Sequence, residues 1–193
     1  MCQASTEAKM ADSRVLVAYS SVHGSTAEIG RAVAFTLGRA GLDVVSMPAI
    51  NVRDVSGYHA VVVGSAVYGG NWRPEADYLL QRFGLQLFQK DVWLFQSGPL
   101  GVSARGIAQS LPAGVAVYAG YLRVKGVATF GGKLGELAAT PLSRLLVRRG
   151  LAGDYRDFAE IRRWAECIAR TIMMNSMLES RAGPLVSGRC TPG

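Results

Sequence analysis

The stretch VLVAYSSVHGSTAEI, residues 15–29, contains the pattern that decides the fold. Its apolar run Val15–Tyr19 is typical of a buried strand, and a short turn rich in hydroxyl groups and glycine follows it. A helix then begins, because Ile29, Val33 and Leu37 repeat at i, i+4 and i+8 on one face. The stretch therefore predicts a strand, a tight turn and a helix N-terminus.

A turn of this kind can bind an anion. Backbone N–H groups without helical partners converge at a helix N-terminus, and the helix dipole adds about half a positive charge there. No Lys or Arg lies between Ser20 and Ile29, so neutral donors are expected to hold a phosphate. Gly24 lets the backbone approach the anion closely. The hydroxyl donors of the turn are Ser20, Ser21, Ser25 and Thr26. The alternative interpretation is an ordinary hydroxyl-capped turn without a ligand.

The type of phosphate site can be narrowed by exclusion. A nucleoside-triphosphate loop needs G-x-x-x-x-G-K-[ST], but Gly131-Gly132-Lys133 is followed by Leu134. The dinucleotide fingerprint G-x-G-x-x-G is absent, and the second predicted strand, residues 43–47, ends without an acidic ligand for a ribose. What remains suits a mononucleotide such as FMN, whose terminal phosphate fits wholly inside such a turn.

Two further apolar runs end in loops of small residues. Ala60–Val63 and Val92–Phe95 are continuously apolar, which is typical of parallel strands covered on both faces. Their loops follow the carboxyl ends of the strands, where open α/β sheets bind ligands. Tyr68 and Trp72 could supply aromatic faces for a flat ring, or could pack at the start of the next helix.

These residues carry a resemblance to a known family. The segment Tyr19–Thr26 resembles the phosphate loop of flavodoxins. The segments GSAVYGGNWRPEA, VWLFQSGPLG and FGGKLG resemble flavodoxin-domain oxidoreductases, a group that includes the menaquinone-dependent protoporphyrinogen dehydrogenases. The resemblance covers roughly residues 14–172. It implies an α/β flavodoxin-like three-layer sandwich, with a five-stranded parallel sheet in the order 2-1-3-4-5, helices on both faces, and FMN as the cofactor.

The resemblance also implies which residues bind the cofactor. Ser21, Gly24, Ser25 and Thr26 take the phosphate-binding positions. Val22 and His23 stand where ordinary flavodoxins have threonines, although their backbone amides can still bind. The His23 side chain could help to neutralise the phosphate or could point to solvent. The residues expected to frame the flavin ring are Ala66, Val67, Tyr68, Gly69 and Gly70, then Ser97, Gly98, Pro99, Leu100 and Gly101. No catalytic base stands out, and two histidines without an HExxH pattern argue against a histidine-based metal site.

A single domain over residues 14–173 is predicted, with flexible ends at 1–13 and 174–193. The expected strands are 15–19, 43–47, 60–64, 92–96 and 127–130, and the expected helices are 26–40, 74–87, 111–122, 141–149 and 158–173. Asp157 with Glu160 resembles a capping box at the start of the last helix. Three cysteines without CxxC spacing and an N-terminus without a signal-peptide core favour the cytoplasm. Cys167 is expected to pack within its helix.

The positive charge lies mainly in the second half of the chain. Up to Lys90 there are 8 Lys and Arg against 7 Asp and Glu, whereas from Asp91 onward there are 13 against 7. The basic residues concentrate at Arg144, Arg148, Arg149, Arg156, Arg162, Arg163 and Arg170. Small electron-carrying flavodoxins are generally acidic, so a pI near 9.7 favours an anionic substrate, or a membrane surface that holds a quinone.

Residues 141–149 predict a short helix with leucines on one side and arginines along its border, which suits an anionic membrane surface. A short helix packed on the domain edge is the alternative. Nucleic acid is not expected as a partner, because zinc-finger spacing and an RNP-like motif are missing.

Two functions stay open. One is an FMN-dependent oxidoreductase acting on a porphyrinogen-type or other small substrate with a quinone acceptor. The other is a non-enzymatic carrier between redox proteins.

Overall fold

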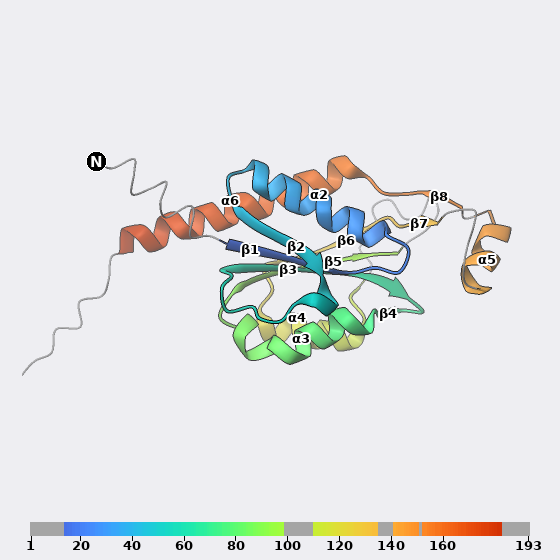
Figure 1. The fold of residues 1–193 in the computed structure, drawn as a ribbon, viewed down its shortest axis with the longest axis horizontal. Coiled ribbons are helices and arrows are strands. Elements are labelled where there is room, and N and C mark those ends of the chain that lie inside the picture. The colour runs from blue at the N-terminus through green and yellow to red at the C-terminus, as the bar shows by residue number, and fades with distance from the viewer. Residues whose placement is uncertain (1–13, 99–109, 135–140, 151, 183–193) are drawn as a thin grey trace, which may run out of the picture.

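The apolar runs at residues 15–19, 60–63 and 92–95 each form a strand of one central sheet. The computed structural model describes residues 14–98, 110–134, 141–150 and 152–182 (Figure 1). The parallel strands lie in the order β2-β1-β3-β5-β6, which confirms the predicted flavodoxin-like order. Their bounds are β1 Arg14–Ser20, β2 Asp43–Pro48, β3 Ala60–Tyr68, β5 Asp91–Ser97 and β6 Gly126–Phe130.

Three short strands were not expected from the sequence. Strand β4, Asn71–Trp72, pairs antiparallel with the end of β3 and gives the sheet a sixth strand. Gly69 and Gly70 make this reversal with φ angles of 57° and 78°, a conformation that favours glycine. Strands β7, Lys133–Leu134, and β8, Gly153–Asp154, form a separate antiparallel pair.

Helices cover both faces of the sheet, as a series of crossovers between parallel strands requires. Figure 1 shows α2 and α6 on one face and α3 and α4 on the other. The helices are α2 Ser25–Arg39, α3 Pro74–Leu87, α4 Ala113–Leu122, α5 Pro141–Arg148 and α6 Phe158–Ala182, with a 3-10 turn η1 at Ala49–Asn51. No helix in the described part of the chain has the length and apolar character that a membrane span requires.

The core lies in two layers because successive strand residues point to opposite faces. Val15 and Val17 of β1 pack in the layer under α2 and α6, whereas Leu16 and Ala18 pack in the layer under α3. All four side chains are fully buried. The first strand is thereby fixed in the middle of the sheet, and its carboxyl end is held in one position.

The last helix is longer than the sequence analysis predicts. Helix α6 continues to Ala182, so the expected end at Met173 and the flexible tail from residue 174 are wrong up to that point. Residues 174–182 contain no Gly or Pro, and Gly183-Pro184 follow directly. Within this extension the Asn175 amide donates to Asp91 Oδ2 at 2.7 Å, which ties the helix to β5. Cys167, expected to pack within the helix, is exposed.

Candidate flavin site

The three loops singled out in the sequence meet at one edge of the sheet. β1, β3 and β5 run parallel and adjacent, with Ser20 opposite Ser65 and Ala66 opposite Ser97. Their carboxyl ends therefore lie side by side at one edge of the sheet (Figure 1). Pro99, Leu100 and Gly101, expected to frame a flavin ring, lie outside the described residues.

The turn between β1 and α2 has the conformation that an anion site needs. Gly24 has a φ of 85°, and the helix starts at the next residue. The hydroxyl oxygen of Ser25 is buried and has no hydrogen-bond partner within the described residues. A buried hydroxyl without a partner costs free energy, so this atom is suited to receive a bound ligand. Ser21 is half-buried, whereas Val22 and His23 are exposed.

Thr26 links the first loop to the third. Its hydroxyl lies 2.8 Å from the Ser97 hydroxyl, and both side chains are buried. The two residues are far apart in the sequence, so this contact fixes the start of α2 against the carboxyl end of β5. The Thr26 hydroxyl therefore has a protein partner already, unlike that of Ser25.

Ser20 faces a charged pair that the sequence analysis missed. Its hydroxyl donates to Glu75 Oε2 at 2.7 Å, and Glu75 Oε1 lies 3.3 Å from Arg73 Nη2. The hydrogen bond from Ser20 is the main cause that lowers the pKa of Glu75. Ser20 was expected to be a free hydroxyl donor at the turn, but its proton points to the start of α3 instead. The sequence signal was the triplet Arg73-Pro74-Glu75 directly after the second loop.

Two exposed rings, His23 in the β1 turn and Tyr68 at the end of β3, meet edge to face beside the site. The Tyr68 and His23 rings lie with centroids 6.4 Å apart at an interplanar angle of 66°. Tyr68 keeps 39% of its surface exposed. Partial burial raises the pKa of the Tyr68 hydroxyl, against the opposing effect of the Arg73 charge. This ring is thus accessible to a ligand that enters between the first two loops.

Trp72 packs inside the protein. Only 6% of its surface is exposed, and its Nε1 donates to Gln96 Oε1 at 3.1 Å. The Gln96 amide donates in turn to Thr129 Oγ1 at 3.1 Å. Of the two interpretations left open for Trp72, packing is the one the structure shows. The hydrogen bonds from Trp72 to Gln96 and from Gln96 to Thr129 thus hold the carboxyl ends of β5 and β6 and the strand β4 together.

Three other residues expected to frame the flavin ring, Ala66, Val67 and Gly98, lie at the carboxyl ends of β3 and β5. Ala66 is buried, and Val67 is half-buried against the layer under α3. Gly98 lies so close to Val67 that a Cβ atom there would stand 3.1 Å from the Val67 carbonyl oxygen. The second and third loops are therefore in direct contact.

One expected surface charge is not available to a partner. The Arg156 side chain is only 3% exposed, because its guanidinium pairs with Glu28 at 2.8 Å and Asp154 at 2.6 Å. These bonds, the one to Asp154 first, raise the pKa of Arg156, and they lower the pKa of Asp154. Arg156 instead joins β8 to the first turn of α2, beside the β1 turn.

Comparison with known proteins identifies the family. The model of the flavodoxin domain family matches residues 16–149, more than half of the chain. This chain belongs to the flavodoxin domain family. No curated protein matches it.

Solved structures show the same fold. Rubredoxin oxygen:oxidoreductase from Desulfovibrio gigas has a TM-score of 0.58 at 17% identity. The matched region covers 90% of this chain but only 39% of the oxidoreductase. Flavodoxin 2 from Bacillus cereus has a TM-score of 0.57 at 17% identity, covering 82% and 99%. A flavodoxin from the domain Archaea has a TM-score of 0.54 at 15% identity, covering 82% and 98%. This chain thus spans well under half of the oxidoreductase and nearly the whole of each flavodoxin.

FMN is the cofactor of flavodoxin domains, and this site fits it. The Ser25 hydroxyl is a buried donor without a partner among the described residues, and Gly24 turns the backbone into the start of α2 without a side chain in the way. A Cβ atom at Gly24 would meet nothing within 4 Å, so space is open beside the turn. Neutral donors at a helix N-terminus are the donor set that a phosphate ester needs.

Proposed function

We propose that this chain is an FMN-dependent oxidoreductase that takes electrons from a small anionic substrate, a porphyrinogen-type molecule in the first instance, and passes them to a quinone. Bound FMN would supply the electron transfer in both directions. Each two-electron step would remove two hydrogen atoms from the substrate and convert the quinone to a quinol. The observation that carries this proposal is the basic character of the end where the three loops meet.

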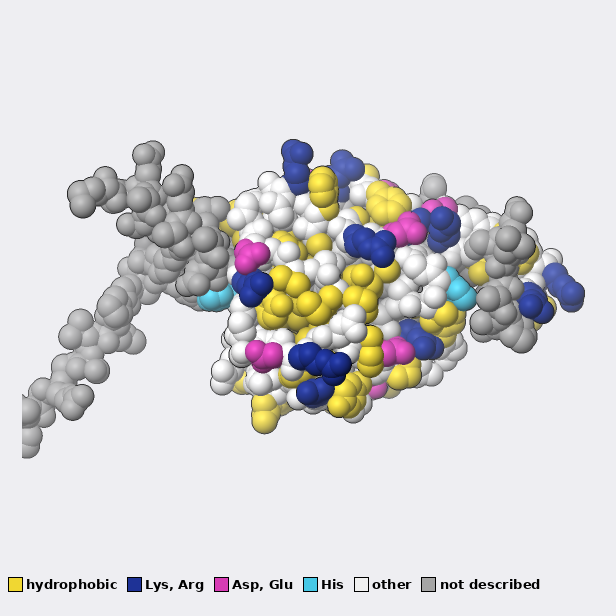
Figure 2. Space-filling model, in the orientation of Figure 1, with side chains coloured by type: hydrophobic (Ala, Val, Ile, Leu, Met, Phe, Trp, Pro, Cys, Tyr) yellow, Lys and Arg dark blue, Asp and Glu magenta, His cyan; other side chains and the backbone are white. Residues whose placement is uncertain are grey.

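That end differs from the acidic surface typical of small electron-carrying flavodoxins. Between Leu137 and Gly153 the chain has three arginines and no acidic residue. Helix α5 projects from the end of the molecule where the β1 turn lies (Figure 1), and the Lys and Arg side chains there are visible in Figure 2. Positive potential around a site raises the local concentration of anionic ligands and repels basic protein partners. The carboxylates of a porphyrinogen suit such a field.

The cofactor's phosphate would be held by Ser21, Gly24, Ser25 and Thr26, with the backbone amides of Val22 and His23. Ser25 would donate its hydroxyl, which has no partner in the described part of the chain, and Thr26 would remain bonded to Ser97. Loops 66–70 and 97–101 would frame the ring, with Tyr68 as its exposed aromatic face. Trp72 has no part in stacking because it is buried.

Helix α5 would bring this end to an anionic membrane, where a quinone resides. Arg148 and Arg149 are exposed, and Leu145 keeps 45% of its surface in solvent. A short basic helix with exposed apolar side chains can lie in the headgroup region of a bilayer. The proposal places the protein at the inner face of the membrane, in peripheral contact through residues 141–149.

Anaerobic spectroscopy tests the substrate and the acceptor separately. The protein loaded with FMN is mixed with protoporphyrinogen, and loss of the oxidised flavin absorbance is followed. A menaquinone analogue is then added, and the absorbance is expected to return. The proposal would be overturned if protoporphyrinogen did not reduce the flavin and the menaquinone analogue did not reoxidise it.

The second candidate is a carrier between redox proteins. Its support is that solved flavodoxins match this chain over nearly their whole length. The same experiment separates the two functions, because a carrier would exchange electrons rapidly only with a protein partner. Strict dependence on such a partner would favour the carrier.

A further inference from the structure

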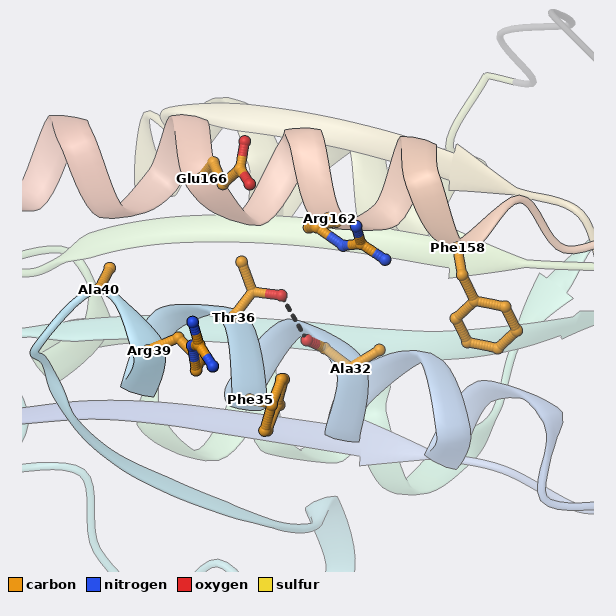
Figure 3. A pocket seen from close by; sticks show the side chains of 8 residues that line it. All are labelled: Ala32, Phe35, Thr36, Arg39, Ala40, Phe158, Arg162 and Glu166. Carbon is orange, nitrogen blue, oxygen red and sulfur yellow. Dashed lines mark hydrogen bonds between the residues drawn. The ribbon is translucent and has the colours of Figure 1, made fainter.

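A groove on the helical face opposite α3 has a lining that the flavin site does not explain. It lies between α2 and α6 and encloses about 520 Å³. Figure 3 shows Phe35 on the side of α2 and Phe158 at the start of α6, with Ala32 of α2 between them. A volume of this size falls in the range of about 300–1,000 Å³ found for small-molecule sites.

The floor of the groove is apolar and its polar groups are satisfied. Ala32 and Ala40 line it, and the Thr36 hydroxyl donates to the Ala32 carbonyl oxygen at 2.9 Å. Both aromatic side chains are in contact with solvent, with 69% of Phe35 and 40% of Phe158 exposed. Large apolar side chains exposed together in one hollow are a binding signal, whereas single ones are common on any surface.

The walls of the groove are held in place. Val33 and Leu37 of α2 pack with Ile161 and Ala165 of α6 beneath it, and all four are fully buried. Phe158 is also fixed from the side, because the guanidinium of Arg156 lies 5.0 Å from its ring centroid. Fewer side chains lose conformational entropy when a ligand binds to a rigid groove than when it binds to a flexible one.

Charged side chains stand at the rim. Arg39 from the last turn of α2 and Arg162 from α6 both line the groove, and Glu166 is the third charged residue there. In Figure 3, Arg162 reaches into the space between the two helices, toward Phe158. Neither arginine has an ion-pair partner within the described residues. The lining therefore has one net positive charge above an apolar floor.

We propose that this groove binds a small amphiphilic monocarboxylate, with its apolar body against Phe35 and Phe158 and its carboxylate at the rim, which carries Arg39 and Arg162. Guanidinium groups pair with carboxylates through two parallel hydrogen bonds, which suits an anion at the rim. The site is separate from the flavin loops, so the proposal goes beyond the function proposed above and stands independently of it.

Calorimetric titration with octanoate tests the groove. Full-length protein loaded with FMN is expected to bind one octanoate saturably, while octan-1-ol and octyltrimethylammonium bind much more weakly. Arg39→Gln and Arg162→Gln are each expected to weaken octanoate binding roughly fivefold, the effect of losing one exposed charge pair. Phe35→Ser should weaken all apolar probes.

The matched control is Arg163→Gln, which removes the same charge from the next position of α6 without changing the groove lining. This variant is expected to bind octanoate as the native protein does. Absence of saturable octanoate binding, equal weakening by Arg163→Gln and Arg162→Gln, or equal binding of octyltrimethylammonium would each overturn the proposal. Unchanged FMN binding in every variant shows that the protein has folded.

Discussion

Among single residues, Ser25 gives the strongest support for a flavin site, because its buried hydroxyl is suited to bind the phosphate. It is buried at the first position of α2, and no described residue accepts or donates a hydrogen bond to it. Protein interiors rarely leave such an atom unpaired, because an unpaired buried polar group costs about 1–3 kcal/mol. A phosphate oxygen at this place would remove that cost.

Ser25→Ala tests this reasoning. Loss of a hydrogen bond to a charged phosphate is expected to weaken FMN binding about tenfold or more, because such bonds contribute about 1.5–3 kcal/mol. Quenching of flavin fluorescence on titration measures the dissociation constant. The control is Ser46→Ala, which removes an exposed hydroxyl from the edge strand β2. Equal affinities of native protein and Ser25→Ala would show that this hydroxyl does not contact the cofactor.

Glu75 gives a prediction about acid stability. The Ser20 hydroxyl, then a backbone N–H hydrogen bond at Glu75 itself, and then the Arg73 charge stabilise its carboxylate and lower its pKa below the ordinary value of 4.5. The unfolded chain then binds a proton more readily than the folded protein does. The stabilising contribution of Glu75 is therefore fully present above 4.5 and is lost as the pH falls through the folded-state pKa.

Glu75→Gln should remove this pH dependence. The difference in unfolding free energy between native protein and variant is expected to be largest near neutral pH and to shrink as the pH falls below 4.5. Urea denaturation at several acidic pH values measures it. Ser20→Ala is expected to show the same trend in part, since it removes the main cause of the shift. A difference that stays constant over the whole acid range would contradict the assignment.

At the scale of elements, α6 depends on the cap at its first turn. Asp157 Oδ1 accepts hydrogen bonds from the backbone N–H groups of Ala159 at 2.8 Å and Glu160 at 3.1 Å. The Asp157 half of the predicted capping box is thus present, and it satisfies two N–H groups that have no helical partner. The same turn carries Phe158, which lines the groove between α2 and α6.

Asp157→Ala is expected to lower the free energy of unfolding by about 1 kcal/mol, the usual cost of losing an N-cap. Thermal and urea denaturation both measure this loss. Asp157→Asn serves as the matched control, because asparagine caps helices about as well as aspartate does. If both variants were destabilised equally, charge rather than capping would explain the effect.

At the scale of the whole molecule, the distribution of charge distinguishes this chain from an acidic carrier. The net charge is +7, and much of the excess lies after Asp91. The structure shows that this charge is not uniformly available, because Arg156 is buried in its pairs with Glu28 and Asp154. What remains exposed near the flavin end includes Arg148 and Arg149.

Removing these two charges tests membrane contact. The double variant Arg148→Gln, Arg149→Gln is expected to lose binding to phosphatidylglycerol vesicles at low salt, since each surface arginine contributes about 1 kcal/mol to such binding. Co-sedimentation measures the bound fraction, and phosphatidylcholine vesicles serve as the neutral comparison. Arg31→Gln, Arg53→Gln removes the same charge elsewhere on the surface. Native protein that does not sediment with anionic vesicles would remove membrane contact from the proposed function.

The sequence by itself determined the five parallel strands and the turn after β1, and the resemblance to flavodoxins gave the order of those strands. These features depend on local patterns: continuous apolar runs, a helical repeat at Ile29, Val33 and Leu37, and glycine where the backbone must turn. The extent of α6 is a local feature that was missed, because the recurring Gly, Pro and Ser of residues 175–193 suggested a tail, although no helix breaker occurs before Gly183.

Only the tertiary structure decided which side chains are free to act. Ser20 meets Glu75 across 55 positions, Thr26 meets Ser97 across 71, and Arg156 meets Glu28 across 128. The hydrogen bond from Trp72 to Gln96, 24 positions away, shows that Trp72 is a packing residue. A hydroxyl, ring or guanidinium is chemically the same in sequence whether or not a distant residue occupies it. Its availability depends on the way the strands and helices pack, which no local pattern encodes.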